Sequence, residues 1–233
     1  MGFVVLPALP ADISGVYDVY FAAFKDDAIT KALFPSASAN DMTNPESEFR
    51  KAHTAHVLQF WQNNLTQHTL KCVDSRTGKI VGMALWDVYL TSSDWSKPEI
   101  GWLQGHEKER AEALISPLWD AREKMWSKER YLYCHVIAVH PDAQRKGVGQ
   151  VLVDYGKKIA SQADLPIYVE SSKAAIRLYE KLGFQRLKER PVHESNDLQL
   201  GRSDSEEKDH EVPLLVWVPG DKEGLLPDAV QIA

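Results

Sequence analysis

A short basic turn joins an apolar strand to an amphipathic helix in the second half of the chain. The turn reads Gln144-Arg145-Lys146-Gly147-Val148-Gly149, and an apolar run that ends at Val139 precedes it. After the turn, one apolar stripe follows the helical spacing i, i+3, i+4, i+7 and i+11, formed by Val148, Val151, Leu152, Tyr155 and Ile159. The pattern therefore predicts a buried strand, a tight turn and a helix of about residues 147–163 in immediate succession.

This turn has the features of an anion site. The first amides of a helix have no partner within the helix, and the helix dipole favours negative charge there. Glycines allow a ligand to approach the backbone closely, and Arg145 and Lys146 raise the local potential. The two common nucleotide-binding motifs do not fit: the chain has no GxxxxGK run followed by Ser or Thr, and Leu152 occupies the third glycine position of GxGxxG. The turn predicts a pyrophosphate site of another kind.

The rest of the chain predicts a single domain, residues 1–233, with a mixed sheet and helices on its faces. Strands of alternating or apolar pattern come first, joined by a hairpin turn at residues 75–78, and a strand–helix–strand–helix–strand order follows. A polar loop is expected at Pro35–Thr43, a helix from Asn44-Pro45 to about Asn64, and an exposed polar loop at 193–210. This pattern is an α+β arrangement.

An insertion of about residues 90–130 interrupts the strands. Two helices are expected there, Glu107–Ile115 and Pro117–Lys128, because Ser116 and Pro117 are typical of a helix start. Tryptophans gather in and near the insertion, and two interpretations are open. In one interpretation they pack the helices onto the body of the domain, and in the other they form an aromatic wall over a substrate cleft. The five tryptophans are Trp86, Trp95, Trp102, Trp119 and Trp126.

Composition excludes several partners and leaves others open. The formal net charge of −6 argues against nucleic acid. No apolar run reaches the roughly 18–20 residues of a membrane span, and the N-terminus does not resemble a signal peptide. Two cysteines, Cys72 and Cys134, are too few for a disulfide framework and favour free thiols in a cytoplasmic protein. The sequence predicts no oligomeric state.

Two segments together resemble the GNAT N-acetyltransferase superfamily. The first is the turn Gln144–Gly149, which fits Gln/Arg-x-x-Gly-x-Gly, and the second is Val169–Phe184, which ends in Leu-Tyr-Glu-Lys-Leu-Gly-Phe. The resemblance implies the GNAT fold, a mostly antiparallel sheet splayed at its centre, and acetyl-CoA as co-substrate. It implies that the turn holds the pyrophosphate and that strand residues lie beside the pantetheine arm. The implied cofactor-binding residues are Ile137, Ala138, Val139, Gln144, Arg145, Lys146, Gly147, Val148, Gly149, Gln150, Ser172, Ala175 and Tyr179.

The same resemblance implies catalytic residues. Tyr179 stands where the family commonly has the tyrosine that protonates the departing thiolate, and Ser172 stands where it often has an asparagine. His135 matches one of two strand histidines of arylalkylamine N-acetyltransferases, and Tyr133 stands at the other position.

The chemistry agrees with these roles, because amine acylation needs a neutral amine and an acid for the thiolate. In a regular strand Tyr133, His135 and Ile137 share one face and Cys134 lies on the other. Glu170 and Glu99 are alternative bases, and Tyr179 is equally a residue of a packing stripe.

The sequence therefore predicts an acetyl-CoA-dependent N-acetyltransferase that acts on a small-molecule amine by direct attack. A peptide or protein amine is the alternative acceptor, and a non-catalytic acyl-CoA-binding module is the alternative class. No metal is expected, although His53 and His56 lie at i, i+3 on a helix, because no third ligand is evident.

Overall fold

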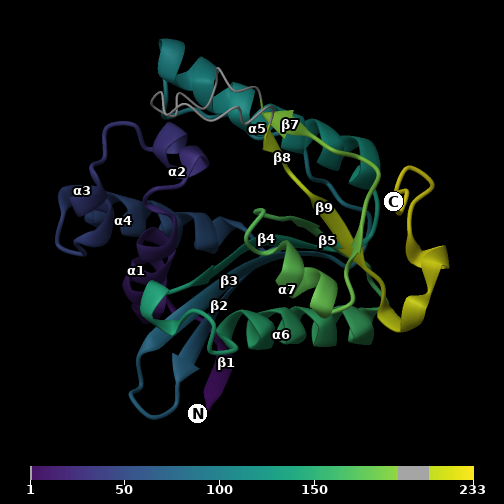
Figure 1. The fold of residues 1–233 in the computed structure, drawn as a ribbon. Helices are drawn as coiled ribbons and strands as arrows, with labels where there is room; N and C mark the ends of the chain where they lie inside the picture. The colour runs from purple at the N-terminus through teal and green to yellow at the C-terminus, as the bar shows by residue number, and fades with distance from the viewer. Residues whose placement is uncertain (1, 194–209) are drawn as a thin grey trace, which may run out of the picture.

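A seven-stranded sheet forms the centre of the computed structural model, which describes residues 2–193 and 210–233 (Figure 1). The strand order is β1-β2-β3-β4-β5-β9-β6. β4 and β5 pair in parallel, and every other pair of neighbours is antiparallel, so the predicted mixed sheet is confirmed. The strands are β1 Phe3–Pro7, β2 Gln67–Asp74, β3 Ile80–Tyr89, β4 Tyr131–Val139, β5 Ile167–Glu170, β6 Gln185–Arg186 and β9 Leu214–Trp217. A separate hairpin consists of β7 (Val192–His193) and β8 (His210–Glu211).

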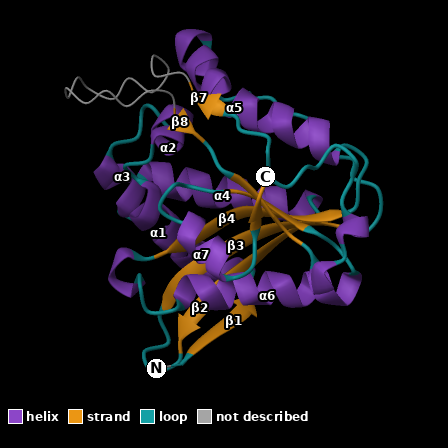
Figure 2. Ribbon diagram, turned by 45° about the vertical axis from the view of Figure 1, so that its right-hand side comes forward, coloured by secondary structure: helices purple, strands orange, loops and turns teal. Residues whose placement is uncertain are grey.

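Helices cover both faces of the sheet (Figure 2). One face carries α1 (Ile13–Phe24) and α5 (Gly105–Trp126). α3 (Ala39–Thr43) and α4 (Glu48–Asn63) pack beside α1, and α2 (Ala28–Leu33) packs on α5. The other face carries α6 (Val148–Ala163) and α7 (Ile176–Lys181). Among the described residues, no helix combines the length and apolarity that crossing a membrane requires.

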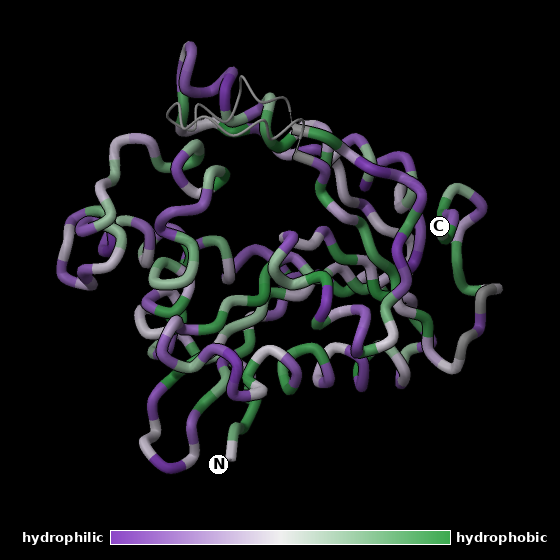
Figure 3. Tube along the Cα trace, viewed as in Figure 1, coloured by the Kyte–Doolittle hydropathy of each residue, from purple (hydrophilic) through white to green (hydrophobic). Residues whose placement is uncertain are grey.

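The apolar pattern of the sequence explains this layering. The predicted stripe of α6 is buried at Val148 and Leu152, against Cys134 of β4 and Ala84 of β3. Hydrophobic residues predominate along the central strands, and hydrophilic residues in the turns and along the projecting part of α5 (Figure 3). Burial of these side chains supplies the main favourable term for the fold.

Three local expectations are wrong. α5 is one continuous helix with Pro117 inside it. Its first half packs on α2 through Leu114, and its second half packs on the sheet through Met125, so burial at both ends outweighs the cost of an interior proline. The stretch expected as a loop contains α3, and α4 begins at Glu48. Ser47 caps α4, because its hydroxyl accepts a hydrogen bond from the Arg50 amide.

The expected polar loop at 193–210 lies almost entirely outside the described residues. The chain after β9 continues through two short 3-10 turns and returns to the sheet. There Ile232 forms an isolated bridge with Leu187.

Candidate active site

A cleft opens where β4 and β5 part. Their pairing ends at Cys134 and Val169, although β4 continues to Val139. The cavity holds about 420 Å³. Its walls come from residues 134–137 of β4, residues 169–173 at and after β5, α7 with the residue before it, α1, α2 with the residue before it, Leu118 of α5, and residues 211–212. The sheet therefore splays at the place that the sequence predicted.

Tyr179 lies at the inner wall of this cleft. Its side chain comes from α7 and is 5% exposed, and its hydroxyl oxygen lies 3.8 Å from the Sγ atom of Cys134. Burial raises the pKa of Tyr179 well above its usual value and raises the pKa of Cys134 to about 12. Cys134 therefore stays a thiol at neutral pH, which is the less nucleophilic form of cysteine.

His135 lies at the same opening, on the opposite side from Cys134. The β3–β4 register shifts between Leu85 and Trp86. Leu85 pairs with Val136 and Trp86 pairs with Cys134, so His135 has no partner residue on β3. This is a β-bulge, and it reverses the alternation of faces along β4. The sequence expectation that Ile137 shares a face with Tyr133 and His135 is therefore wrong: Ile137 packs with Cys134 towards α6.

Glu170 lies beside His135 in the cleft wall and is held by two tyrosines. The Tyr133 hydroxyl donates to its Oε2 atom at 3.0 Å, and the Tyr168 hydroxyl donates to its Oε1 atom at 3.1 Å. Burial raises the pKa of Glu170, and these two hydrogen bonds oppose the rise. Tyr133 thus lies behind Glu170 and does not line the cleft. Glu99, the other alternative base, is exposed in a loop and does not line the cleft either.

The glycine turn at the start of α6 has backbone features that suit an anion. Arg145 has φ +58° and Gly147 has φ +92°, while Lys146 between them is not left-handed. Such an alternation directs successive backbone N–H groups towards one point. No side chain caps α6, whereas Asp27 caps α2 and Ser47 caps α4. The first amides of α6 are therefore available to an anionic ligand.

The two glycines of this turn have different roles. Only glycine tolerates the φ of Gly147 easily, and a Cβ atom there would meet nothing within 4 Å. A Cβ atom on Gly149 would lie 3.1 Å from Leu178 of α7. Gly149 therefore also permits close packing of α6 on the helix that carries Tyr179.

The structure brings only some of the predicted cofactor residues into the cleft itself. Ile137, Ser172 and Ala175 line it together with Tyr179. The turn residues lie at the start of α6, outside the cleft walls, and the side-chain amide of Gln144 connects the turn to β4 by donating to the Val139 carbonyl at 3.4 Å. The remaining predicted residues lie on β4 or in the turn and first turn of α6: Ala138, Val139, Arg145, Lys146, Val148 and Gln150.

Trp86 and Trp126 are buried as the packing interpretation expects, Trp102 is 56% exposed, and the cleft has no wall of tryptophans. Trp86 is 2% exposed beneath α6, Trp95 stacks on the guanidinium of Arg122, and the indole N–H of Trp102 donates to the Leu33 carbonyl. None of the tryptophans lines the cleft, and the insertion contributes Leu118 to its wall. Besides Tyr179, the aromatic side chains that line the cleft include Tyr20 and Phe24 of α1.

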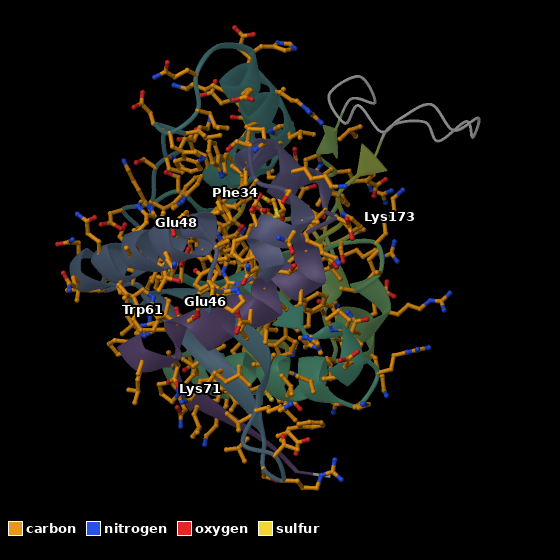
Figure 4. All side chains as sticks on the ribbon, turned by 90° about the vertical axis from the view of Figure 1, so that its left-hand side faces the viewer. Phe34, Glu46, Glu48, Trp61, Lys71 and Lys173 are labelled. Atoms are coloured by element: carbon orange, nitrogen blue, oxygen red, sulfur yellow. The ribbon has the colours of Figure 1, made fainter. Side chains whose placement is uncertain are left out.

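Sequence reasoning also missed charged groups at the cleft. Asp27 and Glu211 line it with Glu170, and among the lining residues Lys173 is a cation exposed at the rim (Figure 4). Asp87 lies behind His135, with Oδ2 3.6 Å from the imidazole Nδ1 atom. One signal for Asp87 was available: it is the only charged residue in the strand sequence IVGMALWDVY.

Of the two histidines on α4, only His53 is packed against other side chains. His53 lies among four aromatic rings at centroid distances of 4.5–6.1 Å, and its Nδ1 atom has no hydrogen-bond partner. His56 is exposed. Within the described part of the chain, no three His, Cys, Asp or Glu side chains are grouped as a metal site requires.

The environment of His53 predicts a loss of stability in acid. Burial lowers the pKa of His53 from 6.5 to about 4. Between these pH values the unfolded chain therefore binds more protons than the folded chain. The contribution of neutral His53 to the free energy of unfolding is complete above pH 6.5 and is lost as the pH falls towards 4. The shift corresponds to a loss on the order of 3 kcal/mol. In urea unfolding across this range, His53→Phe should flatten the pH dependence, and His56→Gln should not; parallel curves for His53→Phe and wild type would contradict the assignment.

Comparison with known proteins decides the family. A family model described as "Acetyltransferase (GNAT) family" matches residues 36–184. The chain belongs to the GNAT acetyltransferase family. Members of this family use acetyl-CoA, and membership makes the chain an N-acetyltransferase, as the sequence predicted.

Relatives and solved structures agree with this family. A probable acyltransferase of Ajellomyces capsulatus, SID5, is 32% identical over 141 residues, which are 59% of this chain and 93% of that protein. An acetyltransferase structure from Corynebacterium glutamicum, described as histone acetyltransferase HPA2 and related acetyltransferase, has 24% identity and a TM-score of 0.56, covering 94% of this chain and 97% of the other. Arylalkylamine N-acetyltransferase 2 from Aedes aegypti has 12% identity and a TM-score of 0.64, covering 94% and 99%. The structural likenesses show that this chain has the GNAT fold.

Proposed function

We propose that this GNAT protein transfers the acetyl group of acetyl-CoA to the amine of a small cationic molecule in the cleft between β4 and β5. The observation that carries the proposal is the cleft itself, which has Tyr179 on one side and His135 with Glu170 on the other. A thioester in the opening of the sheet would lie between an acid and a base. The uncapped turn at the start of α6 would hold the pyrophosphate of the same molecule.

The lining of the cleft favours a small amine with an apolar part. Three carboxylates line it, from Asp27, Glu170 and Glu211, and they favour a positively charged group. The rings of Tyr20 and Phe24 offer apolar contact beside them. The likeness in fold to an arylalkylamine N-acetyltransferase agrees with such an acceptor.

The residues of the cleft would divide the proton transfers. The base removes one proton from the ammonium group, which frees the lone pair for attack on the thioester carbonyl. The C–N bond forms, the C–S bond breaks, and the second proton lost by the nitrogen balances the proton that the thiolate receives through Tyr179. A thiolate in this apolar environment should be strongly basic, since burial raises the pKa of the neighbouring Cys134 thiol to about 12. A tyrosine whose pKa is raised by burial is therefore matched to it. The same value for Cys134 argues for direct attack without an acyl-cysteine.

We also propose that the protein works in the cytoplasm, because both cysteines are free thiols and buried.

The test of the function is an acceptor screen with acetyl-CoA in which free thiol and N-acetylated product are both measured. Phenethylamine, spermidine and a lysine-containing peptide represent the three acceptor classes. We expect the highest kcat/KM for one of the two small amines. Preference for the peptide would establish the alternative acceptor, and binding of acetyl-CoA with no turnover on any amine would indicate a non-catalytic acyl-CoA-binding module.

His135→Ala separates a catalytic base from free deprotonation of the amine. If the imidazole accepts the proton, the variant should lose most activity at low and neutral pH, where the amine is charged, and recover part of it at high pH. The measurement is kcat/KM against pH for the best acceptor of the screen. An unchanged profile would transfer the role to Glu170 or to water.

A further inference from the structure

Asp87 is a buried carboxylate that lies between His135 at the cleft and Arg122 in the interior. Its side chain is 8% exposed on β3, and its Oδ2 atom lies 3.6 Å from Nδ1 of His135 and 3.4 Å from Nη2 of Arg122. Its Oδ1 atom accepts a hydrogen bond from the side-chain amide of Gln67 at 3.1 Å. A carboxylate so far from water requires such partners, because an unpaired buried charge costs several kcal/mol.

Arg122 holds this carboxylate from the side away from the cleft. Its side chain is 3% exposed, and its guanidinium lies 3.8 Å from the ring centre of Tyr133 and 4.3 Å from that of Trp95. Its Nε atom donates to the Tyr131 hydroxyl at 2.9 Å. Two rings against the guanidinium and a hydrogen-bond acceptor at Nε leave Arg122 little freedom, so the position of Asp87 is fixed as well. A buried ion pair seldom stabilises a fold more than apolar packing would, and another role for it is expected.

His135 lies on the Asp87 side of β4. Tyr133 pairs with Asp87, and His135 shares the face of Tyr133, so its side chain faces Asp87 and remains 46% exposed. The bulge at His135 changes the face of the residues that follow it, such as Ile137. One ring nitrogen thus faces a fixed carboxylate, while the ring itself lines the cleft.

We propose that Asp87 is a positioning residue for the acetyl transfer, and that it holds the Nδ1–H of His135 so that the Nε2 lone pair faces the bound amine. This proposal rests on the proposed function. The Nε2 atom takes one proton from the ammonium group, the Asp87 carboxylate stabilises the imidazolium, and the proton then passes to solvent. Arg122 keeps the carboxylate in place and does not exchange a proton, because guanidinium stays charged.

Several other charged and titratable groups face the imidazole. Tyr133, from the same strand, has its ring centre 5.5 Å from that of His135. Glu170 of β5 and Arg122 of α5 act on the same region, and Asp27, Lys173 and Glu211 line the same cleft. A pH profile therefore reports this whole group, and a direct readout of the imidazole is needed.

The decisive experiment is ¹⁵N NMR of the imidazole nitrogens in the full-length wild-type chain, with the His135 signals assigned by comparison with His135→Gln. We expect neutral His135 to carry its proton on Nδ1. A neutral His135 with its proton on Nε2 would overturn the proposal. This measurement does not depend on whether any variant of Asp87 folds.

Asp87→Asn supplies the functional readout. An asparagine amide can donate to Nδ1 and so favours the opposite tautomer. We expect the NMR signals to show that change, kcat to fall at least about tenfold, and the Kd of acetyl-CoA to stay unchanged.

The control is Asp12→Asn, which removes another ion pair, to Lys71 at 2.6 Å, outside the cleft. It should change stability only. Acetyl transfer by a wild-type enzyme whose His135 carries Nε2–H would refute the positioning role alone. Absence of transfer to any amine would refute the proposed function, whichever tautomer is present.

Discussion

Tyr179→Phe should lower kcat by about 10²–10⁴, the usual contribution of a general acid or base. The substitution keeps the ring, which packs 5.2 Å from the ring centre of Phe184, and removes the hydroxyl that faces the cleft. The departing thiolate then has no donor at this position. Because burial raises the pKa of Tyr179, its hydroxyl remains protonated throughout the assay range, and its ionisation should add no basic limb to the profile below pH 10.

The control for this prediction is Tyr17→Phe. Tyr17 is another buried tyrosine, in α1, and it does not line the cleft. Both variants should keep the wild-type Kd for acetyl-CoA and similar thermal stability, and only Tyr179→Phe should lose kcat. A near-normal kcat for Tyr179→Phe, measured where chemistry limits the rate, would leave the tyrosine with a packing role only.

Gly147→Val should weaken binding of acetyl-CoA about 10- to 100-fold. The φ of Gly147 is +92°, which a β-branched residue adopts only with strain of roughly 1–3 kcal/mol, or about one to two factors of ten in affinity if it opens the turn. The turn would then lose the converging amides at the start of α6. Calorimetry with acetyl-CoA measures the change.

Gly101→Val is the matched control for this loss of affinity. A Cβ atom on Gly101 also meets nothing within 4 Å, and the φ of Gly101 lies outside the left-handed region. The Gly101→Val protein should therefore bind acetyl-CoA like the wild type. A folded Gly147→Val protein with unchanged affinity would show that the turn does not hold the pyrophosphate. Gly149→Val is less suitable, because its Cβ atom would press on Leu178 and displace the helix that carries Tyr179.

The sequence was most informative where local chemistry and local structure coincide. The turn Gln144–Gly149 combines cations, glycines and a helix start, and each of these features restricts the backbone by itself. The structure accordingly has a left-handed Gly147 and an uncapped helix at that place. The segment that carries Tyr179 was likewise predictable, because its motif fixes both a helix and the following turn at Gly183.

The other side of the cleft could not be predicted in the same way. A bulge shifts the register of β4 by one residue, and no residue type at His135 indicates it. Regular alternation therefore assigned Ile137 to the wrong face. The tryptophans are similarly ambiguous, because a large aromatic residue at helical spacing fits both a core and a cleft. Asp87 was recognisable as unusual, but its partners are distant in the sequence.

Rapid-quench mass spectrometry of the enzyme and its small-molecule products, during the first turnover with acetyl-CoA and the best amine, tests direct transfer in the β4–β5 cleft. We expect the amine to become acetylated in step with the release of free CoA, while the protein, including Cys134, stays unmodified at every time point. An acetylated Cys134 that forms and decays at the rate of turnover, or CoA release without acetylated amine, would contradict the mechanism.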